Sequence, residues 1–132
     1  MNTKTTGDKS EAAFLAKFIF LNYVVLIPFG DNQRYDFVID RGNGFERVQI
    51  KTGILEKEFV TANACSMLTT GKRKSYSGSI DLFGIYCPQL NTFYLIPISD
   101  IRDNQTEIYL RIAPYKNGRT VKKGLDTSKY KL

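Results

Sequence analysis

Asp36, Gln49 and Lys51 are the residues of this chain whose types and spacing could together do chemistry. The segments 35–40 and 47–51 alternate apolar and polar side chains as strands do, and the glycine-containing residues between them predict a hairpin turn. Side chains two positions apart on a strand share a face, so Gln49 and Lys51 point the same way. A carboxylate, an amide oxygen and an ammonium would then converge on one side of the hairpin, where they could hold a divalent cation and a phosphate.

Each of these side chains has a chemical role and a simpler alternative. Asp36 suits a hard cation such as Mg²⁺, which prefers oxygen ligands and keeps several waters, but it could also be a solvated carboxylate. Gln49 could ligate through its uncharged amide oxygen, joined by the main-chain carbonyl of Ile50, or merely hydrogen-bond across the sheet. Lys51 would stabilise charge beside the attacking water and the phosphate, unless it is an ordinary surface lysine. Glu11, near the start of the first helix, could reach the cation through a bound water or could complement the helix dipole.

Two other aspartates fit structural roles better. Asp40 shares the face of Asp36 but lies about 13 Å along the strand, at about 3.3 Å per residue, so we expect it to open the turn. Asp81 precedes a later apolar run beside a basic loop, and we interpret it as structural.

The residue types that are absent narrow the chemistry further. The chain of 132 residues has no histidine, which excludes Ser-His-Asp and Cys-His triads and most zinc hydrolase sites. Its two cysteines, Cys65 and Cys87, lack metal-ligand spacing and are expected to be reduced and partly buried. Any hydrolysis must therefore use carboxylates, lysine and a metal ion. No secretory signal precedes the first helix, so we expect a cytoplasmic protein.

The net charge of +6 favours an anionic partner, with nucleic acid ahead of a membrane surface. Basic residues cluster twice, and tyrosines stand close to both clusters. Such mixtures suit phosphate contact and insertion into a DNA groove, although charge runs are more often only solvated loops. The candidate DNA-binding residues of these two clusters are Lys72, Arg73, Lys74 and Tyr76, and Arg111, Lys116, Arg119, Lys122 and Lys123.

The elements that must position these residues follow from the apolar patterning. Asp8 or Ser10 can cap a helix that runs to about Leu21, after seven frayed residues. A continuous apolar run at 24–28 predicts a buried strand. Further predicted elements are strands at 57–62, 80–86, 92–98 and 108–112, a basic loop at 69–79, a helical turn at 99–103 and an extended basic tail at 114–132. One helix, several strands and late helical cover indicate a single α/β or α+β domain around a central mixed sheet.

This arrangement resembles the PD-(D/E)XK nuclease superfamily. By that resemblance Asp36 matches the motif aspartate, Gln49 the acidic position, Lys51 the motif lysine and Glu11 the helix glutamate. Tyr35 stands where the superfamily has proline, and Gln49 where it has an acid. A small single-domain branch, which includes an intron-encoded homing endonuclease, is similar over the segments 7–13, 28–32, 35–36, 48–52, 80–83, 94–97 and 110–112, and at Lys116 and Asn117.

The resemblance implies a restriction-endonuclease-like core and an Mg²⁺-dependent DNA endonuclease, with Mn²⁺ able to substitute. Double-stranded DNA would be the substrate, Asn117 would join the DNA-binding residues, and a homo-oligomer (a dimer or a tetramer) would be needed to cut both strands. Site-specific homing is the most specific role. A junction resolvase and a DNA-binding protein with a decayed nuclease site are the alternatives; an RNA-binding module is less favoured because no aromatic RNA-binding strand motif is present.

Overall fold

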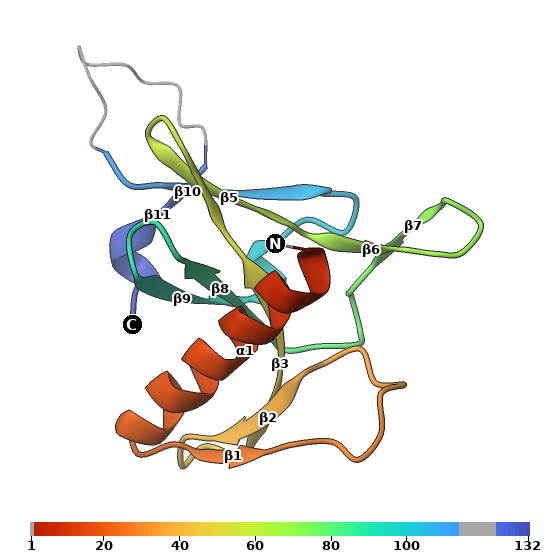
Figure 1. The fold of residues 1–132 in the computed structure, drawn as a ribbon, viewed down its shortest axis with the longest axis vertical. Coiled ribbons are helices and arrows are strands. Elements are labelled where there is room, and N and C mark those ends of the chain that lie inside the picture. Colours follow the sequence, from red (N-terminus) through yellow and green to blue (C-terminus); the bar gives the residue numbers. More distant parts are fainter. Residues whose placement is uncertain (1, 114–123) are drawn as a thin grey trace.

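The structure is a computed structural model that describes residues 2–113 and 124–132. One helix, α1 (Thr3–Phe20), lies diagonally across a sheet (Figure 1). The strands are β1 (Val24–Leu26), β2 (Phe37–Asp40), β3 (Phe45–Thr52), β4 (Ile54–Glu56), β5 (Phe59–Asn63), β6 (Cys65–Met67), β7 (Arg73–Ser75), β8 (Leu82–Cys87), β9 (Thr92–Pro97), β10 (Glu107–Arg111) and β11 (Leu125–Asp126). Two short 3₁₀ turns are η1 (Ile98–Asp100) and η2 (Thr127–Lys129).

The central sheet has the predicted mixed character. Its order is β1-β2-β3-β8-β9, in which β3 and β8 are parallel and every other pair is antiparallel. The predicted hairpin is confirmed, because β2 pairs with β3 in a register that sets Phe37 opposite Val48 and Asp40 opposite Phe45. The predicted alternation is confirmed as well, since Phe37, Ile39, Val48 and Ile50 are buried.

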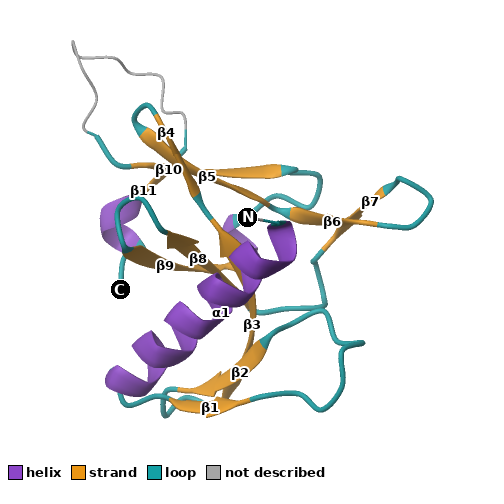
Figure 2. Cartoon of the chain, viewed as in Figure 1, coloured by secondary structure: helices purple, strands orange, loops and turns teal. Residues whose placement is uncertain are grey.

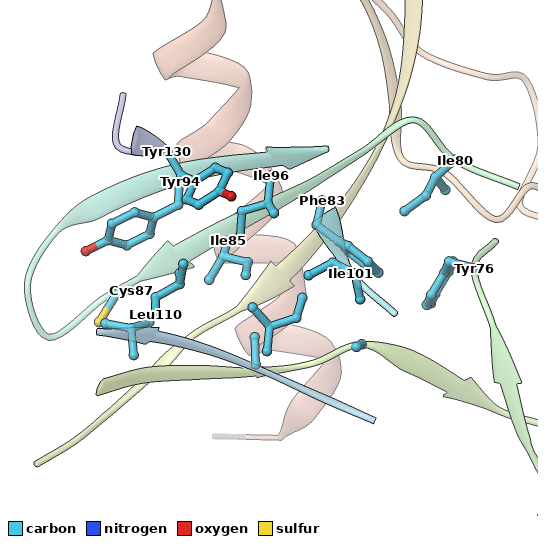
Figure 3. Packing of buried hydrophobic residues seen from close by; sticks show 14 residues of the cluster. Tyr76, Ile80, Phe83, Ile85, Cys87, Tyr94, Ile96, Ile101, Leu110 and Tyr130 are labelled. Carbon is cyan, nitrogen blue, oxygen red and sulfur yellow. The ribbon is translucent and has the colours of Figure 1, made fainter. Parts of the chain in front are cut away.

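Two hydrophobic cores lie on the two faces of this sheet. On one face, Phe14 and Phe18 of α1 pack against Ile39, Val48 and Ile50 of β2 and β3. On the other, alternate residues of β8 and β9 pack against the second, four-stranded sheet, which has the order β11-β10-β5-β4 (Figures 2 and 3). The α+β class is therefore as predicted. The expected late helical cover is wrong within the described residues, because a second sheet takes its place.

The first residue of the helix differs from the prediction. α1 starts at Thr3, so the predicted fraying of residues 2–7 is wrong. Asn2 caps it by accepting a hydrogen bond from the Thr5 N–H at 2.8 Å, which satisfies one of the free donors of the first turn. Ser10, one of the two predicted caps, is instead buried in the middle of the helix. Within the described residues, no helix is long and apolar enough to cross a membrane.

Three other predicted segments also differ from the structure. Residues 24–28 were expected to form a buried strand, but β1 is a short edge strand with exposed Val24 and Leu26. The basic segment 69–79 contains β7, which pairs with β6 in a two-stranded hairpin. In the predicted tail, 124–132 fold back on the domain: β11 pairs with β10, and Tyr130 is buried. The rest of the tail, 114–123, lies outside the described residues.

Candidate active site

The predicted site residues meet where β2 begins and β3 continues past it. The Asp36 N–H donates to the Val48 carbonyl at 2.8 Å, which is the backbone hydrogen bond at the end of the pairing between β2 and β3. One carboxylate oxygen of Asp36 then accepts a hydrogen bond from the Ile50 N–H at 2.8 Å. The side chain of Asp36 thus takes the ladder position that β2 leaves empty. This contact fixes the carboxylate against the open edge of β3.

The main chain of Ile50 offers an oxygen at the same edge. In the antiparallel pairing of β2 and β3, the N–H and C=O of a residue face the same neighbour, so the Ile50 carbonyl points to the side of Asp36. The Gln49 side-chain amide lies 3.2 Å from it and donates through Nε2. A half-turn of the amide about its terminal bond exchanges nitrogen and oxygen, after which both groups present oxygen. Gln49 and Ile50 therefore lie side by side next to Asp36, and their role as metal ligands stays a prediction.

Glu11 reaches this edge from α1. Its carboxyl group hydrogen-bonds to Asp36, and the pKa of Glu11 is raised to about 8, chiefly by burial and then by the hydrogen bond to Asp36 and the negative charges of Asp36 and Asp8. The helix-dipole alternative is wrong, because the first turn of α1 contains no acid and Glu11 lies two turns further along. In the metal-free protein, Glu11 keeps its proton near neutral pH and donates it to Asp36.

Close packing between α1 and the central sheet sets the position of the helix that brings Glu11 to Asp36. The hydroxyl groups of Ser10 and Thr52 are 2.6 Å apart and link the helix to the end of β3. Gly84 of β8 lies under Phe14, and a Cβ there would be 2.7 Å from Ile50 Cδ1 and 3.1 Å from Phe14 Cζ. A larger residue at this position would require the side chains of Ile50 and Phe14 to shift.

Lys51 lies on the face of β3 opposite the helix. Its Nζ donates to the Tyr76 hydroxyl at 3.1 Å and is 4.8 Å from the centroid of the tyrosine ring. A carboxyl pair, an amide and the main-chain carbonyl that accepts from this amide therefore lie at one sheet edge, and the same strand carries a lysine. These groups include oxygen ligands for a cation and a positive group for a phosphate.

A family model for PD-(D/E)XK endonucleases matches residues 1–131, nearly the whole length of the chain. The chain belongs to the PD-(D/E)XK endonuclease family. The fold is similar to that of a solved bacterial homing endonuclease, I-Ssp6803I, with a TM-score of 0.77 and 23% sequence identity over 99% of this chain and 89% of that chain. At this identity the similarity concerns the fold. No curated protein matches the chain by sequence.

PD-(D/E)XK endonucleases use divalent metal ions, and the donor set of this site fits one. Among residues 2–113 and 124–132, no group of three His, Cys, Asp or Glu side chains could hold a metal. A cation bound here would therefore need neutral oxygens beside the carboxylate of Asp36, and the Gln49 amide and the Ile50 carbonyl lie next to it. A nearby divalent cation would lower the pKa of Glu11, which burial and then the contact with Asp36 raise, since a positive charge favours the carboxylate form.

Other predicted residues of this PD-(D/E)XK endonuclease lie away from the site. Asp40 accepts a hydrogen bond from the Gly42 N–H at 2.8 Å and so opens the turn, as expected. Asp81 accepts from both the backbone and the side chain of Arg47, at 2.7 and 3.1 Å, and this partner lowers the pKa of Asp81. Both aspartates are structural, as the sequence indicated.

The predicted DNA-binding residues divide into three groups. Lys72, Arg73 and Lys74 are exposed on the β6–β7 hairpin, which projects from the body of the domain (Figure 1). Arg111 ends β10, opposite Phe59 of β5. Lys116, Asn117, Arg119, Lys122 and Lys123 lie outside the described residues. Tyr76 is a correction, because it is only 5% exposed and its ring is not available to insert into DNA.

Arg34 and Ser10 are two residues near the site that the sequence pattern did not indicate as site residues. Arg34 donates to the Ser66 hydroxyl at 2.8 Å and to the Ser75 carbonyl at 2.5 Å, so it joins the segment before Asp36 to the β6–β7 hairpin. Ser10 offered only a generic cap signal. Their roles depend on contacts between residues 32 to 42 positions apart, which no local pattern reveals.

The raised pKa of Glu11 gives an expected pH dependence of stability. The folded protein binds this proton more tightly than the unfolded chain, so stability from Glu11 is present below pH 4.5 and is lost as the pH rises toward about 8. Glu11→Gln removes the titration. The melting temperature of the variant, measured in EDTA, should gain on that of the wild type between these values and level off above them. A constant difference from pH 4 to pH 9 would contradict the assignment.

Proposed function

We propose that this PD-(D/E)XK endonuclease is an Mg²⁺-dependent, site-specific enzyme of the homing type that hydrolyses phosphodiester bonds in double-stranded DNA. The observation that supports the proposal is the contact of Glu11 with Asp36 beside Gln49 and Ile50, on the strand that also carries Lys51. These residues come from α1, from the start of β2 and from β3. A core without a catalytic task has no need to bring two acids together in a half-buried place, because their charges repel.

The residues of the site divide the work as follows. Asp36, Gln49 and the Ile50 carbonyl would hold the cation, and Glu11 would reach it through a water. When bound, the cation would supply polarisation of the phosphate and activation of a water. Lys51 stabilises negative charge that develops on the phosphate and orients the attacking water. Mn²⁺, which also accepts oxygen ligands, would substitute for Mg²⁺.

Cleavage of plasmid and mixed genomic DNA tests the proposal. The purified protein is incubated with Mg²⁺, Mn²⁺ or EDTA, beside the variants Asp36→Asn and Lys51→Met. We expect discrete products that require metal and that neither variant forms. Since a rare target could be missing from these substrates, a fragment of the native locus completes the set. Absence of cutting on all of them would overturn the proposal.

Two outcomes would direct the function elsewhere. Preferential cutting of four-way junctions over linear duplex would make the protein a junction resolvase. Binding of DNA without cutting, equal in the wild type and both variants, would make it a DNA-binding protein with a decayed site. Gln49 favours this second candidate, because the site has one fewer negative charge than a site with an acid at that position.

The β6–β7 hairpin is the proposed DNA-contacting surface among the described residues. Replacement of Lys72, Arg73 and Lys74 by glutamine should weaken binding and flatten its salt dependence, since each lost phosphate contact lowers the slope of log K against log[salt] by about 0.9. Affinity measured from 50 to 300 mM salt checks this. A triple replacement of Lys4, Lys9 and Lys129, which are exposed elsewhere on the domain, is the charge-matched control. An unchanged slope in the hairpin variant would mean that the hairpin does not contact DNA.

Cleavage of both strands requires more than one copy of this chain, because each copy carries one site. Large apolar side chains are exposed around the end of α1 and the edge strand β1, among them Phe20, Val24, Ile27 and Phe29. Exposed apolar groups beside an unpaired strand edge suit contact with a second copy. Light scattering should therefore give the mass of a dimer or a tetramer rather than that of a 15.0 kDa monomer.

A further inference from the structure

We propose that Tyr76 is a positioning residue that aims the ammonium of Lys51 at the reaction centre. This inference rests on the proposed function for its catalytic consequence. Its structural part stands on geometry alone. Lys51 Nζ donates to the Tyr76 hydroxyl at 3.1 Å and also lies 4.8 Å from the ring centroid. Within the described residues, this tyrosine is the one hydrogen-bond partner of the Lys51 ammonium.

The hydroxyl of Tyr76 is a fixed point because the rest of the side chain is buried. The ring is 5% exposed and packs edge-on against Phe83, with centroids 5.4 Å apart and the planes at 83°. Figure 3 shows it in the core cluster beside Phe83 and Ile80. Its position is therefore set by the core of the domain, in contrast to the exposed cations that follow β6.

Arg34 fixes the same ring from the other segment of the site. Its guanidinium carbon lies 4.0 Å from the centroid of Tyr76, a cation–π contact, while its nitrogens bind Ser66, Ser75 and the hydroxyl of Ser79. Because Arg34 lies two residues before Asp36, one tyrosine ring relates the lysine to the segment that carries the aspartate. The segment before Asp36 and the side chain of Lys51 therefore contact the same buried tyrosine.

The chemistry explains why a lysine needs such an acceptor. An ammonium on a four-carbon chain has many rotamers and three N–H donors. One donor held by a fixed oxygen restricts the rotamers and leaves two donors for the phosphate and the water. A catalytic group that is already held in place loses less conformational entropy when the transition state forms. Phenylalanine at this position would fill the same space and leave the ammonium without that restraint.

Tyr76→Phe tests the proposal, because it removes one oxygen and keeps the ring. At saturating enzyme, the single-turnover cleavage rate should fall on the order of 10-fold, the effect of one charge-assisted hydrogen bond. DNA affinity should remain within about twofold. In a Lys51→Met background the same change should have no further effect, since the two residues act as a unit. An unchanged rate, or an equal loss in the Lys51→Met background, would overturn the proposal.

A readout that needs no cleavage separates this inference from the proposed function. The order parameter of the Lys51 side chain at Cε, from ¹³C relaxation, should be high in the wild type and should fall in Tyr76→Phe. Tyr130→Phe is the matched control, because Tyr130 is also buried in this cluster but donates to Asp100 at 2.8 Å. It should alter neither the cleavage rate nor the Lys51 order parameter. Equal mobility of Lys51 in the wild type and Tyr76→Phe would overturn the positioning role, even if the protein proves to cut no DNA.

Discussion

Lys51→Met is expected to reduce cleavage by at least about 10²–10³-fold, the usual effect of removing a group that stabilises transition-state charge. Methionine keeps the length of the side chain and its packing against Tyr76, but it has neither charge nor donor. The loss should therefore appear in the rate at saturating enzyme. DNA affinity should change little, since binding is shared among the many other cations of a chain with 19 Lys and Arg.

Two further variants serve as comparisons in this experiment. Lys51→Arg keeps the charge but not the compact ammonium, so it should recover part of the activity at most. Lys129→Ala removes an exposed lysine that lies 3.9 Å from Asp100, far along the chain from the site, and should cut like the wild type. A Lys51→Met protein that cuts at the wild-type rate would refute the role of this lysine.

Asp36→Asn is expected to remove both metal binding and cleavage. The asparagine oxygen can still accept from the Ile50 N–H, so the local fold should be kept, while the carboxylate that we propose as the charged ligand of the cation is lost. Mg²⁺ or Mn²⁺ should raise the melting temperature of the wild type, because a ligand that binds only the folded state stabilises it. The same ions should leave the melting temperature of the variant unchanged.

Asp40→Asn is the matched control for this change. It alters the same residue type on the same strand, four positions further on, and asparagine can still accept from the Gly42 N–H. Its response to metal should equal that of the wild type. If instead Asp36→Asn retained the full metal-induced shift, the cation would have to bind elsewhere, and the assignment of Asp36 as its ligand would fail.

The sequence by itself determined the hairpin and the face on which its polar residues lie. Strand alternation at 35–40 and 47–51 has a period of two, so the burial of Phe37, Ile39, Val48 and Ile50 required no knowledge of distant contacts. The same local pattern placed Asp36, Gln49 and Lys51 on the polar side of the hairpin, and the resemblance to PD-(D/E)XK nucleases matched them to the motif positions. Absence of histidine excluded most alternative hydrolases for the same reason, since composition does not depend on the fold.

Local patterning failed where a distant partner decides the outcome. The run 24–28 is apolar enough for a buried strand, yet β1 is the outermost strand of its sheet, with no partner on its outer side within the described part of the chain. The tail looked like a solvated basic segment, yet Tyr130 enters the core and donates to Asp100 thirty residues away. Neither the exposure of β1 nor the burial of Tyr130 can be predicted from a window of a few residues.

Only the tertiary structure decided how the site is completed. It brought Glu11 of α1 to Asp36, through the Ser10–Thr52 contact and the packing of Phe14 over Gly84. It also showed that Tyr76, which was predicted to contact DNA, accepts a hydrogen bond from Lys51. A sequence pattern fixes which way a side chain points from its own strand. The distance between two elements depends on the packing of all the residues between them, and that distance decides which groups can act together.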